Sequence, residues 1–227
     1  MMYHAIIVAA GKGIRTGDKQ PKQFALLDHT PVVLHSMRAF HSAIKELEII
    51  IVLNQQHQAY WEEIVRHYDV PLHRVVFGGE QRFDSVKNAL DTIPHSVESL
   101  IAVHDAARPL ISRNMIIQLF QSAEEKGAVV PGIMPADSVR SGTFSNNVIA
   151  DRNKIYLIQT PQVFRGDIMK NAYHLDYIPE FTDDASVVEK SGVPIHIIEG
   201  EKDNFKITFP GDHMHAETIL KLRAGNT

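Results

Sequence analysis

Short runs of apolar residues recur along the chain and predict buried strands. Each run is bounded by polar or turn-forming residues, and near-continuous apolarity is typical of strands that are covered on both faces of a sheet. The predicted strands span residues 6–9, 49–53, 75–77, 100–103, 128–130 and 195–198.

Four segments between these strands have the spacing of helices. Apolar residues recur there every three or four positions, so each segment would bury one face. This alternation predicts an α/β fold in which a Rossmann-like, mostly parallel sheet is sandwiched by helices, and ligands of such sheets bind at the carboxyl ends of the strands. The buried faces are predicted to contain Val33, Met37 and Phe40; Tyr60, Ile64 and His67; Val86, Ala89, Leu90 and Ile93; and Met115, Ile116, Leu119, Phe120 and Ala123.

The alternation stops after Pro131. Residues 133–150 contain two short strand-like pieces around a turn with Gly142, which predicts a β-hairpin. The hairpin has too little apolar surface for a core of its own. We therefore expect residues 134–151 to project as an arm that packs on a partner subunit, and residues 1–227 to form a single domain.

Small and basic residues follow the first strand. Residues 12–22 carry four basic side chains against one acidic side chain, a local net charge of +3 in a protein of net charge −4. Such a loop suits a triphosphate, although a glycine turn with solvated lysines is the simpler alternative. The small residues that would let the backbone approach a phosphate are Ala9, Ala10, Gly11 and Gly13, and the basic residues are Lys12, Arg15, Lys19 and Lys22.

Two familiar nucleotide-binding loops do not fit this segment. A P-loop would need Gly-x4-Gly-Lys-Ser/Thr, which does not occur. The dinucleotide fingerprint would need glycine where Thr16 stands, and the strand that ends at Leu53 lacks the acidic residue that a ribose requires. A nicotinamide-dependent dehydrogenase is therefore disfavoured.

Composition narrows the remaining classes. The chain has no cysteine, which excludes disulfides, zinc–thiolate sites and a cysteine nucleophile, and a cytoplasmic location is expected. With 23 basic against 27 acidic residues, neither nucleic acid nor an anionic membrane is expected as a partner. No stretch approaches the roughly 18 apolar residues that span a membrane.

Polar residues at the ends of predicted strands are candidates for a site. Asp105 and Arg108 follow strand 100–103 and should reach the carboxyl edge of the sheet, where Asp105 could hold Mg²⁺ together with phosphate and water. Alternatively, Asp105 caps the helix that starts near Ser112 or pairs with Arg108. Asp203 is a weaker candidate for a second metal ligand, and His104 is expected to be structural.

Motifs spread over the whole chain carry a resemblance to a known family. The glycine loop with Pro21-Lys22-Gln23 resembles the sugar-nucleotide pyrophosphorylase and cytidylyltransferase superfamily. With the later motifs, the chain resembles the 2-C-methyl-D-erythritol 4-phosphate cytidylyltransferases. These motifs are Gly78-Gly79-Glu80-x-Arg82-x-x-Ser85-Val86, His104-Asp105-Ala106-Ala107-Arg108-Pro109, Asp151-Arg152, Gln159-Thr160-Pro161-Gln162, Thr182-Asp183-Asp184-Ala185 and Asn204-x-Lys206-Ile207-Thr208.

The resemblance implies a reaction and a set of site residues. CMP would pass from CTP to 2-C-methyl-D-erythritol 4-phosphate with Mg²⁺ as cofactor, in a homodimer whose arms reach into each other's sites. The catalytic residues would be Arg15, Lys22, Arg152 and Lys206. CTP would be bound by Ala9, Ala10, Gly11, Gly13, Gly78, Ser85 and Asp105, and the acceptor by Asp105, Arg108, Arg152, Thr160, Thr182 and Lys206.

Other interpretations of these residues stay open. Arg152 could pair with Asp151 at the surface, and Thr182 could cap a helix whose first turn carries Asp183 and Asp184. A ribitol-5-phosphate cytidylyltransferase would share the loop and the chemistry. A nucleotide-binding module without catalysis is the alternative from a different class.

Overall fold

The computed structural model describes residues 1–11, 21–95 and 98–225. Within these ranges, eight strands form one sheet in the order β10-β7-β11-β6-β1-β4-β5, with β12 also paired to β7. Pairs β1–β4, β1–β6, β4–β5 and β12–β7 are parallel, whereas β11 and β10 run antiparallel to their neighbours. The strands are β1 (Met2–Ala9), β4 (Glu48–Leu53), β5 (His73–Phe77), β6 (Ser99–Asp105), β7 (Ala128–Ile133), β10 (Leu157–Ile158), β11 (Gln162–Arg165) and β12 (His196–Glu199).

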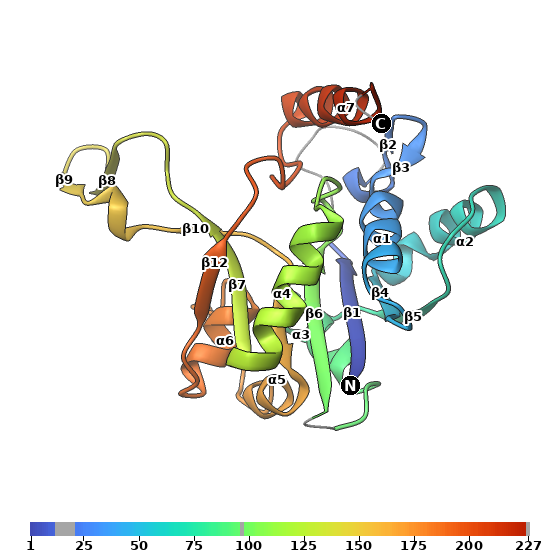
Figure 1. Cartoon of the computed structure of the whole chain (residues 1–227), viewed down its shortest axis with the longest axis horizontal. Helices are drawn as coiled ribbons and strands as arrows, with labels where there is room; N and C mark the ends of the chain where they lie inside the picture. The colour runs from blue at the N-terminus through green and yellow to red at the C-terminus, as the bar shows by residue number, and fades with distance from the viewer. Residues whose placement is uncertain (12–20, 96–97, 226–227) are drawn as a thin grey trace.

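Helices cover both faces of this sheet, as the sequence predicts. Alternate residues of β1 face opposite sides: Ala5 and Ile7 belong to a core with α1 and α4, whereas Ile6 belongs to a second core with α3, α5 and α6. Figure 1 shows α1 and α4 on the near face of the sheet. The helices are α1 (Val32–Ala43), α2 (Gln58–His67), α3 (Arg82–Leu90), α4 (Arg113–Lys126), α5 (Gly166–Ala172), α6 (Asp184–Lys190) and α7 (Pro210–Gly225).

Two sequence predictions about burial are wrong in detail. The strand predicted at 75–77 is β5, which ends the sheet path, and Val75 and Phe77 are 43% and 40% exposed there. Helix α2 buries Trp61 and Ile64, whereas Tyr60 and His67 are exposed, so its buried face is rotated from the predicted one. The predicted buried faces of α1, α3 and α4 are confirmed.

The predicted hairpin is present and stands apart from the sheet. Strands β8 (Val139–Gly142) and β9 (Asn147–Ala150) pair only with each other among the described residues, and they project at the left of Figure 1. Large apolar side chains on this arm face outward: Phe144, Val148 and Ile149 are all exposed. Helix α7 lies at the top of Figure 1, and its residues Ala216 and Ile219 share a buried cluster with Ile207.

Candidate active site

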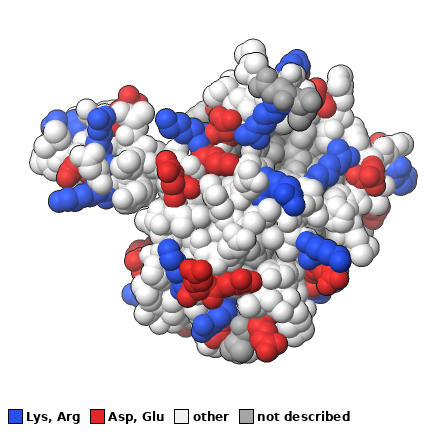
Figure 2. All heavy atoms as spheres, viewed as in Figure 1, with Lys and Arg blue, Asp and Glu red and all other residues white. Residues whose placement is uncertain are grey.

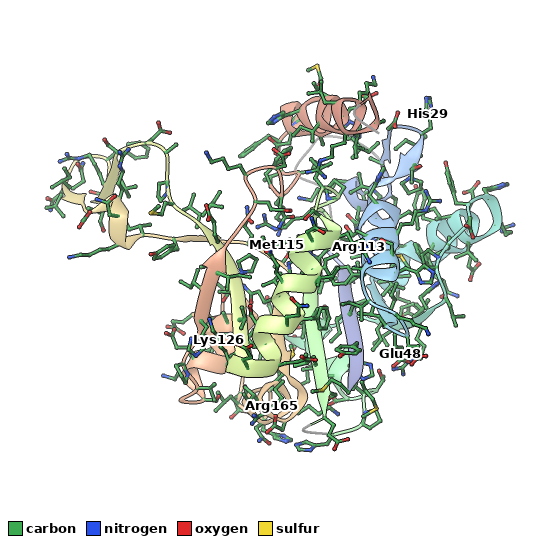
Figure 3. The ribbon with its side chains drawn as sticks, viewed as in Figure 1. His29, Glu48, Arg113, Met115, Lys126 and Arg165 are labelled. Carbon is green, nitrogen blue, oxygen red and sulfur yellow. The ribbon has the colours of Figure 1, made fainter. Side chains whose placement is uncertain are left out.

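A pocket of ≈ 590 Å³ opens at the carboxyl ends of β1, β4 and β6. Its lining comes from the end of β1, the loop and first turn of α3, the residues after β6, and Lys206 near α7. Glu48, Lys126 and Arg165, which Figure 3 labels, lie at the opposite end of the sheet. The lining residues are Val8, Ala9, Ala10, Gly11, Lys22, Gln23, Asn54, Gly79, Glu80, Gln81, Arg82, Ser85, Asp105, Ala106, Ala107 and Lys206.

The start of the glycine loop is fixed by a buried glutamine. The side-chain amide of Gln23 donates to the carbonyl oxygens of Ala9 (2.8 Å) and Gly11 (3.0 Å). The next residue back, Lys22, donates from Nζ to the carbonyl oxygen of Ile207 at 2.6 Å, so the first and last parts of the chain meet at the pocket. The predicted site residues Gly13 and Arg15, with Lys12 and Lys19, lie outside the described residues.

A second loop approaches the first through a glycine. A Cβ atom at Gly78 would lie 2.6 Å from Ser85 Oγ and 2.7 Å from Ala10 Cβ, so only glycine permits this contact. Ser85 Oγ donates to the carbonyl oxygen of Gln81 (3.0 Å) and accepts from the backbone N–H of Gly79 (3.2 Å). Ser85 therefore shapes the loop that lines the pocket ahead of α3.

Asp105 lies between two cations on the pocket wall. Its carboxylate accepts from Lys206 Nζ at 2.8 Å and from Arg82 Nε at 3.5 Å. Burial alone would raise the pKa of Asp105, but Arg82, Lys206 and Arg108 together hold it well below its usual range. Asp105 is therefore an anion at any physiological pH.

Arg82 is anchored from behind by a carboxylate that sequence reasoning did not assign to the site. Asp184 is fully buried, and it accepts from Arg82 Nη2 and from the hydroxyl of Tyr173, both at 2.7 Å. Burial and the charge of Asp184 raise the pKa of Tyr173, which stays protonated. Because Arg82 and Asp184 lie 102 residues apart, no local pattern signals the pair.

The helix that carries Asp184 begins differently from the prediction. Asp183, not Thr182, is the N-cap of α6, and its side chain accepts from the backbone N–H of Ser186 at 2.9 Å. The alternative role of Asp105 as a cap is also wrong, because Ser112 itself caps α4 by accepting from Met115 N–H at 3.0 Å.

The segment that carries Lys206 has no regular secondary structure. The backbone N–H of Ile207 donates to the carbonyl oxygen of Ala107 at 2.8 Å. The guanidinium of Arg108 donates to the carbonyl oxygen of Asn204 at 2.7 Å, and its hydrogen bond with Asp105 joins the backbones, from Arg108 N–H to the Asp105 carbonyl oxygen at 3.0 Å. These contacts hold Lys206 against the pocket.

Comparison with known proteins shows the family to which the chain belongs. A model of the 2-C-methyl-D-erythritol 4-phosphate cytidylyltransferases matches residues 3–222. The chain belongs to this family. Cytidylyltransferases of that name are similar to it: one from Bacteroides fragilis is 41% identical over 95% of this chain and 98% of its own, and one from Porphyromonas gingivalis is 42% identical over 96% and 97%.

Solved structures of this cytidylyltransferase family have the same fold. The 4-diphosphocytidyl-2C-methyl-D-erythritol synthase of Anaerococcus prevotii has a TM-score of 0.81 at 25% identity and covers 97% of this chain and 98% of its own. A bifunctional enzyme of Campylobacter jejuni, called IspDF, has a TM-score of 0.79 at 30% identity. The alignment spans 93% of this chain and 53% of that longer one.

The residues that the cytidylyltransferase resemblance assigns divide into two groups. Lys22, Ser85, Asp105 and Lys206 line the pocket, as do Ala9, Ala10 and Gly11. Of the other described residues with an assigned role, Gly78, Arg108, Arg152, Thr160, Thr182 and Asp203 are outside the lining of this one chain.

Arg152 and Asp203 each have a partner away from the pocket. Arg152 donates to the carbonyl oxygen of Ala136 at the base of the arm (2.7 Å), and Asp203 pairs with Arg223 of α7 (3.1 Å). Asp151 pairs with Lys154 at 3.8 Å, and among the described residues no ion pair joins Arg152 to Asp151.

The pocket suits a divalent cation whose other ligands come from substrate phosphates and water. Among the described residues, no group of three or more histidine or acidic side chains gathers to enclose a metal. Asp105 offers a single ionised carboxylate, and Mg²⁺ is commonly held by one or two carboxylates with substrate phosphates and water. The residues present therefore fit a metal that arrives with a nucleotide.

Proposed function

We propose that the chain transfers CMP from CTP to 2-C-methyl-D-erythritol 4-phosphate and releases pyrophosphate, a step in the synthesis of isoprenoid precursors. One observation supports this above the others. In a chain of this family, Lys22, Asp105 and Lys206 meet at one pocket beside the start of the glycine loop, although they come from distant parts of the sequence.

The chemistry needs positioning and charge more than proton transfer. The acceptor phosphate is already anionic, so it can attack the α-phosphorus of CTP in line without a general base. Lys22, with Arg15, would stabilise the charge of the transition state. Lys206 and Arg152 would hold the attacking phosphate, with Arg108 and Thr182 near the rest of the acceptor.

Asp105 is the residue that would hold Mg²⁺, whereas the weaker candidate, Asp203, pairs with Arg223 outside the pocket lining. When bound, the cation would neutralise charge on the triphosphate oxygens. The carboxylate of Asp105 also accepts from Lys206 Nζ at 2.8 Å, so Asp105 would orient the lysine that holds the acceptor phosphate.

The arm gives a reason to propose a homodimer, with each chain forming a single domain in the cytoplasm. Phe144, Val148 and Ile149 are exposed on an element that cannot bury them itself. A second copy that covers the arm would also bring Arg152 near a neighbouring pocket. On the face shown in Figure 2, basic and acidic side chains are interspersed over the part of the chain that is described, which suits small substrates better than nucleic acid.

A pyrophosphate-release assay tests the proposal. CTP, ATP, GTP and UTP would each be offered with methylerythritol phosphate or ribitol phosphate and Mg²⁺. We expect release only with CTP and methylerythritol phosphate. Release with ribitol phosphate instead would favour the related acceptor, and CTP binding without release from either acceptor would favour a nucleotide-binding module.

A further inference from the structure

A buried chain of hydrogen bonds lies beside the pocket wall at the end of β6. The Nε2 atom of His104 contacts the carbonyl oxygen of Arg108 at 3.0 Å, and its Nδ1 atom contacts Thr160 Oγ1 at 3.3 Å. The backbone N–H of Asp105 donates to the same Thr160 Oγ1 at 3.0 Å. His104 is fully buried and Thr160 is 5% exposed.

The direction of each hydrogen bond follows from the groups involved. A carbonyl oxygen only accepts, so His104 must carry its hydrogen on Nε2. The His104 ring is fully buried, and its nitrogens contact a carbonyl oxygen and a hydroxyl rather than a carboxylate, so the ring is neutral and its Nδ1 atom is an acceptor. The hydroxyl hydrogen of Thr160 therefore points to His104, and the hydroxyl oxygen accepts from Asp105.

This arrangement leaves Thr160 without a hydrogen to give to a phosphate. Phosphate oxygens accept hydrogen bonds, and the one hydroxyl hydrogen of Thr160 is already used by His104. Thr160 also contributes its carbonyl oxygen, which accepts from Asn204 Nδ2 at 2.8 Å. Thr160 thus connects Asp105 with the segment that carries Lys206.

We propose that Thr160 is a positioning residue that acts on the pocket through Asp105, with its hydroxyl oriented by His104, instead of binding the acceptor phosphate itself. The hydroxyl fixes the backbone from which the Asp105 carboxylate extends, and the Thr160 carbonyl fixes the opposing loop. The 2.8 Å contact between Asp105 and Lys206 joins these two segments, so Thr160 fixes the backbone on both sides of it. This inference rests on the proposed function, because it assigns a role to Asp105 in binding nucleotide with its cation.

Thr160→Val is the informative substitution, because valine keeps the branched shape and removes the hydroxyl. Thr160→Ser is its matched control, since serine keeps the hydroxyl. Calorimetry with CTP and Mg²⁺ needs no acceptor, and we expect Thr160→Val to weaken this binding by about 10- to 100-fold, as is typical when a group behind a ligand-binding carboxylate is lost. Thr160→Ser should restore binding to within a few-fold of the unmodified protein.

Steady-state kinetics separate this role from a direct contact with the acceptor. The proposal predicts a lower kcat and a higher Mg²⁺ requirement for Thr160→Val, with the KM for methylerythritol phosphate changed less than threefold or so. A large rise in that KM, with unchanged binding of CTP and Mg²⁺, would overturn the proposal and place Thr160 against the phosphate.

A second variant tests the orientation of the hydroxyl. His104→Gln can still donate to the Arg108 carbonyl oxygen but offers Thr160 no acceptor nitrogen, and its effect should not add to that of Thr160→Val. Additive effects of the two substitutions would show that His104 does not act through Thr160, which would overturn the proposed hydrogen-bond series. If Thr160→Val does not fold, Thr160→Ala carries the same test, with room for a water molecule in place of the hydroxyl.

The unmodified protein separates this proposal from the proposed function. Failure of that protein to bind CTP or to release pyrophosphate would count against the function. Normal binding and turnover in both the unmodified protein and Thr160→Val would count against the positioning role alone.

Discussion

Replacing Asp184 by asparagine would test the buried anchor behind the pocket. The substitution keeps the size of the side chain but removes the charge that accepts from Arg82 and from Tyr173, both at 2.7 Å. Arg82 would then face only Asp105, at 3.5 Å. The loss of one partner from a buried ion pair typically costs about 3–5 kcal/mol, because the other charge stays buried without compensation.

The expected cost here is smaller, since the Arg82 side chain is 28% exposed and water can take up part of the lost contact. We expect Asp184→Asn to lower the free energy of unfolding by about 2–3 kcal/mol. Urea unfolding followed by circular dichroism would measure this as a lower midpoint with an unchanged slope. With a slope near 2 kcal/mol/M, the midpoint would fall by about 1 M.

Two further variants calibrate this result. Asp167→Asn makes the same chemical change in the first turn of α5, where the partner Arg165 is exposed, and should cost less than about 1 kcal/mol. Tyr173→Phe removes one hydrogen bond and should cost about 1 kcal/mol. The reasoning fails if Asp184→Asn costs no more than Asp167→Asn.

Other consequences can be measured separately. Burial lowers the pKa of His104 to about 4 in the folded chain from 6.5 in the unfolded chain, so only the unfolded chain takes up the proton between these pH values. The free energy of unfolding should therefore fall by about 3 kcal/mol as the pH drops from 6.5 to 4. Urea midpoints should fall less over this range in His104→Gln. Lys22→Ala should lower kcat by about 10²–10³-fold, and the lost hydrogen bond to Ile207 should lower the melting temperature by about 2–4 °C. Turnover within a few-fold of the unmodified protein would refute its role. Gly78→Ala should weaken CTP binding in calorimetry, because the new methyl group meets Ser85 and Ala10, whereas equal binding would show that the loops can separate. Deletion of residues 137–147 should give a monomer in light scattering, and an unchanged dimer would remove the arm from assembly.

The sequence predicts those parts of the fold that depend on local periodicity. The predicted strands at 6–9 and 49–53 are uninterrupted apolar runs, and α4 has apolar residues at regular helical spacing, so the sequence predicts each of them. Strand β11 has no such run, because only Val163 and Phe164 of its four residues are apolar. It follows a proline and owes its place between β6 and β7 to pairing partners distant in sequence. No local pattern carries that information.

Site residues, too, can be predicted from the sequence only where a local pattern indicates them. Asp105 could be predicted because a polar residue at the end of a buried strand must reach the carboxyl edge of the sheet. The roles of Asp184 and Thr160 could not, because helix-terminal and turn residues have good local explanations for their polarity. Only the folded chain shows that Asp184 accepts a hydrogen bond from Arg82 and that the hydroxyl of Thr160 accepts one from the backbone N–H of Asp105 in β6.

The hydrogen bond from Lys22 to the carbonyl oxygen of Ile207 joins residues 185 positions apart. A ribosome makes the glycine loop first and the segment with Lys206 much later, so a nascent chain lacks Lys206 and the Ile207 carbonyl oxygen that holds Lys22 until late in its synthesis. We therefore expect the pocket to be complete only after that segment has left the exit tunnel. Nucleotide could then stabilise the finished protein but could not assist its early folding on the ribosome.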